Sequence, residues 1–465
     1  MEQVRDKFAD ECGVVGIYKK DNKDAAKFIY YCLFALQHRG QESAGIAANN
    51  NGHIVNEKGM GLLSDVFTSD SVEELKGNIG IGHVRYTTAG ESILKNAQPL
   101  DVLYKEKQIA LAHNGNIVNV RNIRGILEDS GVVFNTTTDT EVILNLFARN
   151  IKYGEVFAVK ELCQLIRGSY AFVITLENKL IGVRDVYGLR PLCIGENNKT
   201  YVIASESCAL DAIGAQFVRD VEPGEIVVID ENGLKSYKLD SAVKRKMCVF
   251  EYVYFARPDS TLDGINVYTA RYNSGRILAR EIPIEADVVI GVPDSGLPAA
   301  IGYSKESGVP YGVGLIKNKY IGRTFIQPSQ RMREEGVAIK LNPLKEVIAG
   351  KRVIIIDDSI VRGTTSQKLV ATLRHAGAKE VHLLVASPPV ISGCYFGIDT
   401  PSKEHLIAAN MNIEEITASI GADTVAYISL PGLIEAMGTK QDVFCSACFD
   451  EIYPMEIPYH MLGEV

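Results

Sequence analysis

The sequence predicts a two-part protein: an α+β first half of stacked antiparallel sheets, then an α/β second half around a parallel sheet. In the first half, short strand-like segments follow one another closely, as at 170–174 and 180–184. In the second half, strand-like segments at 286–290 and 353–356 alternate with helical patterns. The 465 residues allow each half a core of its own. A lysine-rich stretch, 235–247, is the expected linker.

The composition argues against several classes of protein. The chain has 57 acidic and 49 basic residues, a balance that disfavours nucleic acid or a membrane surface as its main partner. No apolar run reaches the roughly 18–20 residues of a membrane span. Residues 1–11 are polar and lack the apolar centre of a secretory signal. We therefore expect a cytoplasmic protein, whose nine cysteines serve as ligands, nucleophiles or core residues rather than in disulfides.

The strand at 353–356 leads into the most informative stretch of the chain. Its four β-branched residues predict a strand buried on both faces, and Asp357 and Asp358 follow at its carboxyl end, where open α/β sheets bind ligands. A turn and a helix start come next, and backbone N–H groups at a helix start suit a phosphate. Leu369, Val370, Leu373 and Ala376 share one helical face, and Gly377 is the expected stop.

This order of elements predicts a site for a ribose 5-phosphate, because the two carboxylates can accept hydrogen bonds from sugar hydroxyls or hold Mg²⁺. The alternative is a buried strand with an ordinary acidic turn. A second loop supports the site: the strand at 286–290 ends in Gly291-Val292-Pro293-Asp294-Ser295-Gly296. Two glycines flank this loop, so its amides could approach a pyrophosphate closely.

Residues 357–365 resemble the signature with which type I phosphoribosyltransferases bind phosphoribosyl pyrophosphate (PRPP). The resemblance implies a parallel-sheet phosphoribosyltransferase domain. It also implies that PRPP is bound by Asp294, Ser295, Gly296, Asp357, Asp358, Ser359, Val361, Arg362, Gly363, Thr364 and Thr365. In that family Mg²⁺ is needed as well, and the matching ligands are Ser295, Asp357 and Asp358.

Cys12 opens a small strand directly after the polar leader. If the leader is removed, Cys12 becomes the mature N-terminus. A terminal amine has a reference pKa of about 7.7–8.0, so it can accept the proton of the thiol near neutral pH. The nucleophile and its base would then belong to the same residue, as in an N-terminal nucleophile hydrolase.

Four further segments accompany this cysteine, at 37–45 (QHRGQESAG), 82–88 (GHVRYTT), 113–116 (HNGN) and 137–141 (TTDTE). Together they resemble the class II glutamine amidotransferase domain, an N-terminal nucleophile hydrolase of αββα layering. The resemblance implies that Arg85 holds the α-carboxylate of glutamine, Asp139 its α-ammonium, and Asn114 and Gly115 the oxyanion formed when Cys12 attacks. We expect the oxyanion donors at the end of a strand at 108–112, and structural roles for His38, His83 and His113.

The two halves in this order resemble the amidophosphoribosyltransferase family. The resemblance implies a propeptide at 1–11, an amidotransferase domain at 12–240 and a phosphoribosyltransferase domain at 241–465 with a C-terminal cluster-binding segment. It implies that glutamine and PRPP are the substrates in the first step of purine synthesis, with purine nucleotide inhibitors and a homotetramer. Two other functions stay open: a non-catalytic PRPP-sensing regulator and a self-processing amidase without a synthetic role.

Four cysteines of the second half match the positions that ligate a [4Fe–4S] cluster in one branch of that family: Cys248, Cys394, Cys445 and Cys448. The same branch carries a short leader ahead of its catalytic cysteine. A zinc site made by the same four thiolates and a set of unbound core cysteines are the alternatives. The remaining cysteines lie among apolar residues and are expected in the core: Cys32, Cys163, Cys193 and Cys208.

Overall fold

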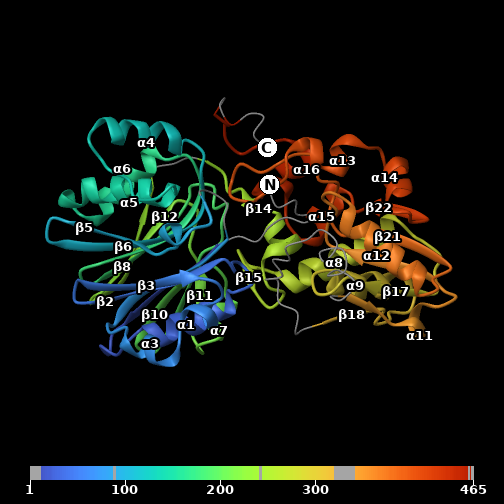
Figure 1. Cartoon of the computed structure of the whole chain (residues 1–465), viewed down its shortest axis with the longest axis horizontal. Coiled ribbons are helices and arrows are strands. Elements are labelled where there is room, and N and C mark those ends of the chain that lie inside the picture. The colour runs from blue at the N-terminus through green and yellow to red at the C-terminus, as the bar shows by residue number, and fades with distance from the viewer. Residues whose placement is uncertain (1–11, 87–90, 240–242, 319–340, 459–460, 462–465) are drawn as a thin grey trace.

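The computed structural model describes residues 12–86, 91–239, 243–318, 341–458 and 461, which form two lobes side by side (Figure 1). The first lobe runs to residue 239, and the second begins at residue 243. The expected propeptide and the expected boundary at 240/241 lie outside the described residues. Within the described ranges, no helix is long and apolar enough to cross a membrane.

Two antiparallel sheets form the centre of the first lobe. The seven-stranded sheet has the order β11-β9-β10-β1-β4-β2-β3, and the six-stranded sheet the order β13-β12-β8-β7-β6-β5. The strands of the first sheet are β1 (Gly13–Lys19), β2 (Ser43–Asn50), β3 (His53–Met60), β4 (Ile79–Arg85), β9 (Cys193–Asn197), β10 (Thr200–Ala204) and β11 (Gln216–Asp220). Those of the second are β5 (Leu100–Tyr104), β6 (Lys107–Ile117), β7 (Gly168–Leu176), β8 (Lys179–Arg184), β12 (Glu225–Asp230) and β13 (Gly233–Lys238).

Helices cover the outer face of each sheet, as Figure 1 shows. One apolar core, with Val14, Ile81 and Val173 among its members, fills the space between the sheets. The seven-stranded sheet packs outward on α1 (Ala26–Ala35), α2 (Leu63–Val66), α3 (Ser69–Glu74) and α7 (Cys208–Asp211). The six-stranded sheet packs on α4 (Val120–Asp129), α5 (Asp139–Asn150) and α6 (Glu155–Leu165). The lobe therefore has the expected αββα layering.

Two strand boundaries in this lobe differ from the sequence prediction. The strand expected at 108–112 continues to Ile117, because Asn114 and Gly115 stay paired with Ala171 and Tyr170 of β7. Polar residues had suggested an end, whereas the pairing partner keeps the chain extended. The expected linker, 235–247, also begins too early, since β13 continues to Lys238 as an edge strand beside β12.

The second lobe is built on a four-stranded parallel sheet with the order β17-β20-β21-β22. Its strands are β17 (Val288–Gly291), β20 (Arg352–Asp357), β21 (Glu380–Val385) and β22 (Thr424–Tyr427). Ile354 and Ile356 pack on one face, with α8 (Val267–Glu281), α9 (Leu297–Ser307) and α15 (Leu430–Ala436). Val353 and Ile355 pack on the other, with α12 (Thr364–His375) and α14 (Ile413–Ile420). β20 is thus buried on both faces, as its composition predicts.

Short elements complete the second lobe and connect it with the first. They are β14 (Met247–Cys248), η3 (Glu251–Phe255), β15 (Thr261–Leu262), β16 (Ile265–Asn266), β18 (Leu315–Lys317), β19 (Leu341–Pro343), α11 (Lys345–Ile348), α13 (Ile407–Asn410), β23 (Phe444–Cys445) and α16 (Ala447–Asp450). β14 pairs in parallel with β23, so the C-terminal segment returns to the junction between the lobes. Tyr395 and Phe396 of the second lobe pack there on Val118 and Leu189 of the first.

Candidate active sites

Cys12 lies buried at the entrance to β1, where it is only 6% exposed. Its Sγ contacts the backbone oxygen of Tyr86 at 3.4 Å, just past the end of β4. The Arg39 Nε donates a hydrogen bond of 3.0 Å to the Cys12 carbonyl oxygen. The main chain and the thiol of this residue are thus held by two different segments of the first lobe.

Burial raises the pKa of the Cys12 thiol to about 12, an effect that Arg85 opposes and Asp139 reinforces. A thiol with this pKa is protonated at neutral pH, so it needs a neighbouring base in order to act as a nucleophile. In the full-length chain the nitrogen of Cys12 is an amide joined to Glu11 and cannot accept a proton. The site therefore has a nucleophile in position, and a free amine at Cys12 would supply the missing base.

Arg85 and Asp139 bring opposite charges to the Cys12 thiol. Arg85 is the last residue of β4, is 2% exposed, and lies 3.5 Å from a carboxylate oxygen of Glu42. Asp139 begins α5 and accepts a 3.0 Å hydrogen bond from the Ile117 N–H. Burial acts to raise the pKa of Asp139, but His113 and backbone N–H groups together have the larger, opposite effect. The pKa is lowered overall, so the carboxylate stays ionised. The pair suits a zwitterionic amino acid.

Asn114 and Gly115 lie on β6, between two residues that contact Asp139. The side-chain Nδ2 of Asn114 is buried and has no hydrogen-bond partner among the described residues. A buried unsatisfied donor costs roughly 1–3 kcal/mol, so it is the kind of group that awaits an acceptor on a ligand. Gly115 has φ +143°, and a Cβ there would come within 2.1 Å of the Ser169 backbone oxygen. Asn114 therefore suits an oxyanion donor, and the residue beside it has to be glycine.

In the second lobe, the ends of two neighbouring strands converge. Asp357 ends β20 and is fully buried, and Asp358 follows it at 2% exposure. The Ser295 hydroxyl, in the loop after β17, donates a short hydrogen bond to Asp358. The Asp358 N–H donates to Asp357 at 2.9 Å, and the Ser359 hydroxyl donates to Asp358 at 2.6 Å. The two loops that the sequence singled out thus form one acidic site at the carboxyl edge of the sheet.

The loop after these carboxylates leads directly into α12. Gly363 precedes the helix with φ +86°, and a Cβ there would lie 2.7 Å from Ile407, so the turn requires glycine. Thr364 and Thr365 form the first turn of the helix, and Val361 is buried and accepts a hydrogen bond from the Ile407 N–H. α12 has twelve residues, and the N–H groups at its start lie just beyond the acidic pair. Such groups suit the 5-phosphate of a ribose bound by the two carboxylates.

The loop after β17 packs tightly against β20. A Cβ at Gly296 would lie 2.4 Å from the Ile356 backbone oxygen, so only glycine allows this approach. Asp294 is exposed and pairs with Lys317 of β18. A cation is thus already present beside this loop. Arg362 carries a buried Nε that has no hydrogen-bond partner within the described ranges.

Four cysteines come together at the junction between the lobes. Cys248 of β14 and Cys445 of β23 lie opposite each other in the strand pair. The Cys448 carbonyl accepts hydrogen bonds from the N–H groups of Ile391 and Ser392, close to Cys394 in the chain. Burial raises the pKa of Cys248, Cys445 and Cys448, and the neighbouring cysteines raise each of them further. The Phe396 N–H donates a 3.3 Å hydrogen bond to the Cys394 sulfur.

Across the described ranges, no group of three or more His, Cys, Asp or Glu side chains is arranged to hold one metal ion. Zinc would need its four thiolates at about 2.3 Å from one centre, whereas each cysteine of a [4Fe–4S] cluster binds a different iron. Four neighbouring cysteines are a donor set that either a [4Fe–4S] cluster or zinc can use. Without a metal, the raised pKa values keep Cys248, Cys445 and Cys448 as neutral thiols.

A buried ionic network at the junction was not predicted from the sequence. Arg39, which contacts Cys12, also binds Glu206 of the first lobe and Glu251 of η3. Arg271 of α8 lines a small cavity together with Ser295 and Asp358. Arg39 lies in the quoted 37–45 segment, but nothing in the sequence pairs it with a carboxylate 212 positions away.

Comparison with known proteins matches both lobes. A family model described as a glutamine amidotransferase domain covers residues 83–212, and one described as a phosphoribosyl transferase domain covers residues 270–387. The chain is 51% identical over 452 residues to the amidophosphoribosyltransferase of Archaeoglobus fulgidus, covering 96% of this chain and 98% of the relative. It is 48% identical over 455 residues to the amidophosphoribosyltransferase of Bacillus subtilis, covering 96% and 95%.

Solved structures agree with these relatives. The glutamine PRPP amidotransferase of Bacillus subtilis, complexed with ADP and GMP, superposes with a TM-score of 0.91 at 47% identity, covering 96% of this chain and 98% of that one. A structure described as the allosteric regulatory enzyme of purine biosynthesis gives a TM-score of 0.92 at 47% identity, covering 96% and 97%.

Proposed function

The chain belongs to the amidophosphoribosyltransferase family, and from that membership we propose how its residues divide the reaction. The enzyme transfers the amide nitrogen of glutamine to PRPP and forms 5-phosphoribosylamine, glutamate and pyrophosphate. This is the first step of purine biosynthesis. A regulator without catalysis would not need the Cys12 site, and an amidase alone would not need the acidic pair of the second lobe.

In the first lobe, Cys12 is the nucleophile and its own freed amine is the base. Arg85 binds the α-carboxylate of glutamine, and Asp139 binds the α-ammonium. Attack of the thiol on the side-chain amide forms an oxyanion, which accepts hydrogen bonds from Asn114 and the Gly115 N–H. Collapse releases ammonia and leaves a γ-glutamyl thioester, which water then hydrolyses to glutamate. The observation that carries this proposal is the burial of the thiol between opposite charges.

In the second lobe, Asp357 and Asp358 accept hydrogen bonds from the ribose hydroxyls. The start of α12, with Gly363, Thr364 and Thr365, binds the 5-phosphate, and the loop with Asp294, Ser295 and Gly296 binds the pyrophosphate. The remaining contacts in this proposal come from Ser359, Val361 and Arg362. Only neutral ammonia can attack PRPP. Because water would protonate the ammonia or let it diffuse away, the site must exclude water during this step.

Mg²⁺ fits this second site, because it is held by one or two carboxylates together with substrate phosphates and water. Asp357, Asp358 and Ser295 are the residues that would hold it. When bound, the ion neutralises charge on the departing pyrophosphate.

A [4Fe–4S] cluster fits Cys248, Cys394, Cys445 and Cys448, and we propose that it is structural. Amide transfer moves no electron, so the group need not take part in the chemistry. A cluster there would tie the start of the second lobe to its C-terminal segment, and metal binding of this kind contributes to folding.

Further features of this proposal come from the family resemblance rather than from the geometry. The Bacillus subtilis structure contains ADP and GMP, which supports inhibition of this enzyme by purine nucleotides. A cytoplasmic homotetramer and removal of residues 1–11 are part of the same proposal. Sedimentation of the purified protein and mass spectrometry of its N-terminus test these two features.

Exchange of single carboxylates tests the PRPP assignment. Asp357→Asn and Asp358→Asn should impair synthesis driven by glutamine and by ammonia alike, because the carboxylates act after ammonia is made. Losing a charged partner typically costs about 1.5–3 kcal/mol, roughly a ten- to hundredfold loss in kcat/KM for PRPP. Asp423→Asn, at an exposed ion pair with Arg374, is the control. Unchanged PRPP kinetics in both variants would exclude this site.

A further inference from the structure

The fully buried Arg39 joins Cys12 to both lobes. Besides its 3.0 Å hydrogen bond to the Cys12 carbonyl, it contacts Glu206 at 2.5 Å and Glu251 at 2.7 and 3.0 Å. All three charged side chains have no solvent exposure. Burial alone would lower the pKa of Arg39, but Glu251 and Glu206 raise it above its ordinary value. The guanidinium is therefore permanently charged and depends on a carboxylate from each lobe.

The carbonyl that Arg39 binds controls the geometry of the nucleophile. Cys12 carries its thiol, its amine and this carbonyl on one Cα. On the following side the chain is fixed, because Val14 exchanges hydrogen bonds with Ser205 through its N–H and carbonyl. Turning the Cys12 carbonyl changes ψ of Cys12, which moves the amine and the thiol relative to β1. A shift of about 1 Å at a reacting group can cost roughly a hundredfold in rate.

Glu251 contacts Arg39 from the second lobe. It begins η3, which packs against α8 through Arg271: the guanidinium donates to the carbonyls of Tyr252 and Ala256 at 2.7 and 2.8 Å. The same Arg271 lines the cavity that contains Ser295 and Asp358. Asp358 and Arg271 thus line one cavity, and from Arg271 a series of contacts runs through η3 and Glu251 to Arg39 and Cys12.

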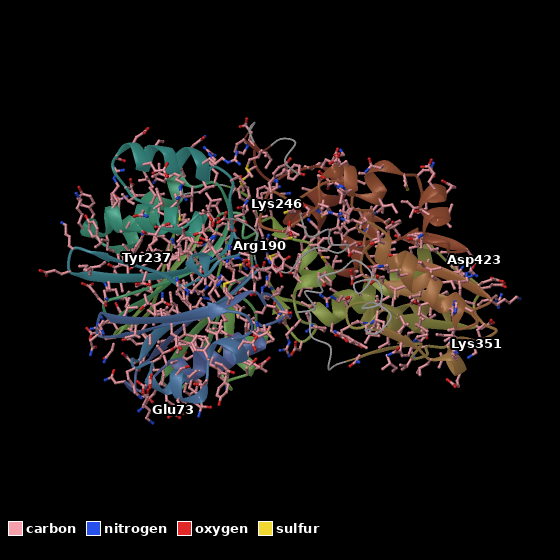
Figure 2. The ribbon with its side chains drawn as sticks, viewed as in Figure 1. Glu73, Arg190, Tyr237, Lys246, Lys351 and Asp423 are labelled. Carbon is pink, nitrogen blue, oxygen red and sulfur yellow. The ribbon has the colours of Figure 1, made fainter. Side chains whose placement is uncertain are left out.

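A second cation marks the same junction. Arg190, labelled between the lobes in Figure 2, lies 3.7 Å from Glu251 and donates to the backbone oxygen of Phe396. It also lowers the pKa of Cys248 against the effect of burial. Glu251 therefore stands between two buried arginines, one beside the nucleophile and one beside the four cysteines.

We propose that Glu251 is a positioning residue for glutamine hydrolysis: through Arg39 it orients Cys12, and through η3 it makes that orientation depend on the PRPP site. The second half of this statement rests on the proposed role of Asp358 in PRPP binding. Glu251 touches neither substrate. Its action is to hold the arginine that holds the nucleophile.

The test replaces Glu251 by Gln, which keeps its volume but removes its charge. Glutaminase activity is measured with and without PRPP, and synthesis is measured from ammonium salt. Glu251→Gln should lower kcat/KM for glutamine by roughly ten- to a hundredfold, remove any effect of PRPP on glutaminase, and leave ammonia-driven synthesis within about twofold. Glu251→Asp should restore the glutamine-dependent rate only in part, because it keeps the charge but its shorter side chain moves the carboxylate.

The matched control is Asp263→Asn. Asp263 forms another buried ion pair between the lobes, with Arg184 at 2.8 Å, but it contacts neither Arg39 nor Cys12 in the described structure. It should leave the response of glutaminase to PRPP intact. If Glu251→Gln does not fold, Arg39→Gln/Glu251→Gln avoids the unbalanced buried charge and should show the same loss.

Three results would overturn the proposal. If Glu251→Gln has normal glutamine kinetics and a normal response to PRPP, the positioning role of Glu251 is excluded, and the proposed function is unaffected. An equal loss in Asp263→Asn would reduce the effect to general docking of the lobes. Absence of ammonia-driven synthesis in the wild-type protein would remove the proposed function as well, so the two failures can be told apart.

Discussion

At the scale of single residues, the proposed glutamine chemistry depends on the activation of a buried thiol. The pKa of Cys12 is raised to about 12, so at pH 8 only about one thiol in ten thousand would ionise on its own. The same burial strengthens the fields of Arg85 and Asp139. A base attached to the same residue avoids bringing a further charge into this space.

Replacing Cys12 by Ala should separate the two half-reactions. The variant should lose glutamine use entirely while keeping synthesis from high ammonium salt, because the second lobe is unchanged. Cys163→Ser, on α6 where the side chain packs against the core of the first lobe, is the control and should keep both activities. Mass spectrometry completes the experiment: a fully active mature chain that still begins at Met1 would contradict the amine's role.

Glu206 predicts a pH dependence of stability. The pKa of this buried carboxylate is lowered: burial would raise it, but His38 and Arg39 outweigh that effect. Because the pKa of Glu206 is lower in the folded chain, its carboxylate stabilises the folded state at pH values above its pKa in the unfolded chain, about 4.3. This stabilisation is lost as the pH falls through the pKa in the folded chain. The stability that wild type has over Glu206→Gln should therefore shrink as pH falls below about 4.3. Urea midpoints of both proteins measure it, and a difference that grows below about pH 4.3 would contradict the assignment.

At the scale of elements, the sequence predicted what local chemistry determines. β20 was correctly predicted from its β-branched run, and α12 from its apolar face and its following glycine. The end of the strand with Asn114 was placed too early, because pairing with β7 overrides the local preference of polar residues. Local rules describe one segment, whereas the neighbour across a sheet decides where that segment stops.

The short pairing of β14 with β23 carries the prediction for the four cysteines. Cys445→Ser should remove one ligand and loosen the C-terminal segment where it pairs with β14, whereas the Cys163→Ser variant should keep its iron. Protein purified without oxygen should be brown and contain about four irons per chain. Visible absorption and iron analysis measure this. Colourless, iron-free and fully active protein, prepared without oxygen, would leave the four as ordinary cysteines.

At the scale of the whole molecule, the sequence alone was enough to propose most of the site residues, but not the contacts between them. The motifs around Cys12 and Asp357 each belong to one stretch of chain, so their chemistry is visible residue by residue. Two sets of contacts join segments that are far apart in sequence. One links Ser295 with Asp358, and the other links Arg39 with Glu206 and Glu251. Only the folded chain shows which distant charges share one buried space.

The stoichiometry of the complete reaction tests most directly whether the two lobes act as one synthetase. Purified protein is supplied with amide-¹⁵N glutamine, PRPP and Mg²⁺, and glutamate, pyrophosphate and label in the product are measured together. We expect glutamate and pyrophosphate to appear in equal amounts, with the label in phosphoribosylamine and no pyrophosphate when either substrate is omitted. Glutamate released without matching pyrophosphate, or product without label, would contradict the account.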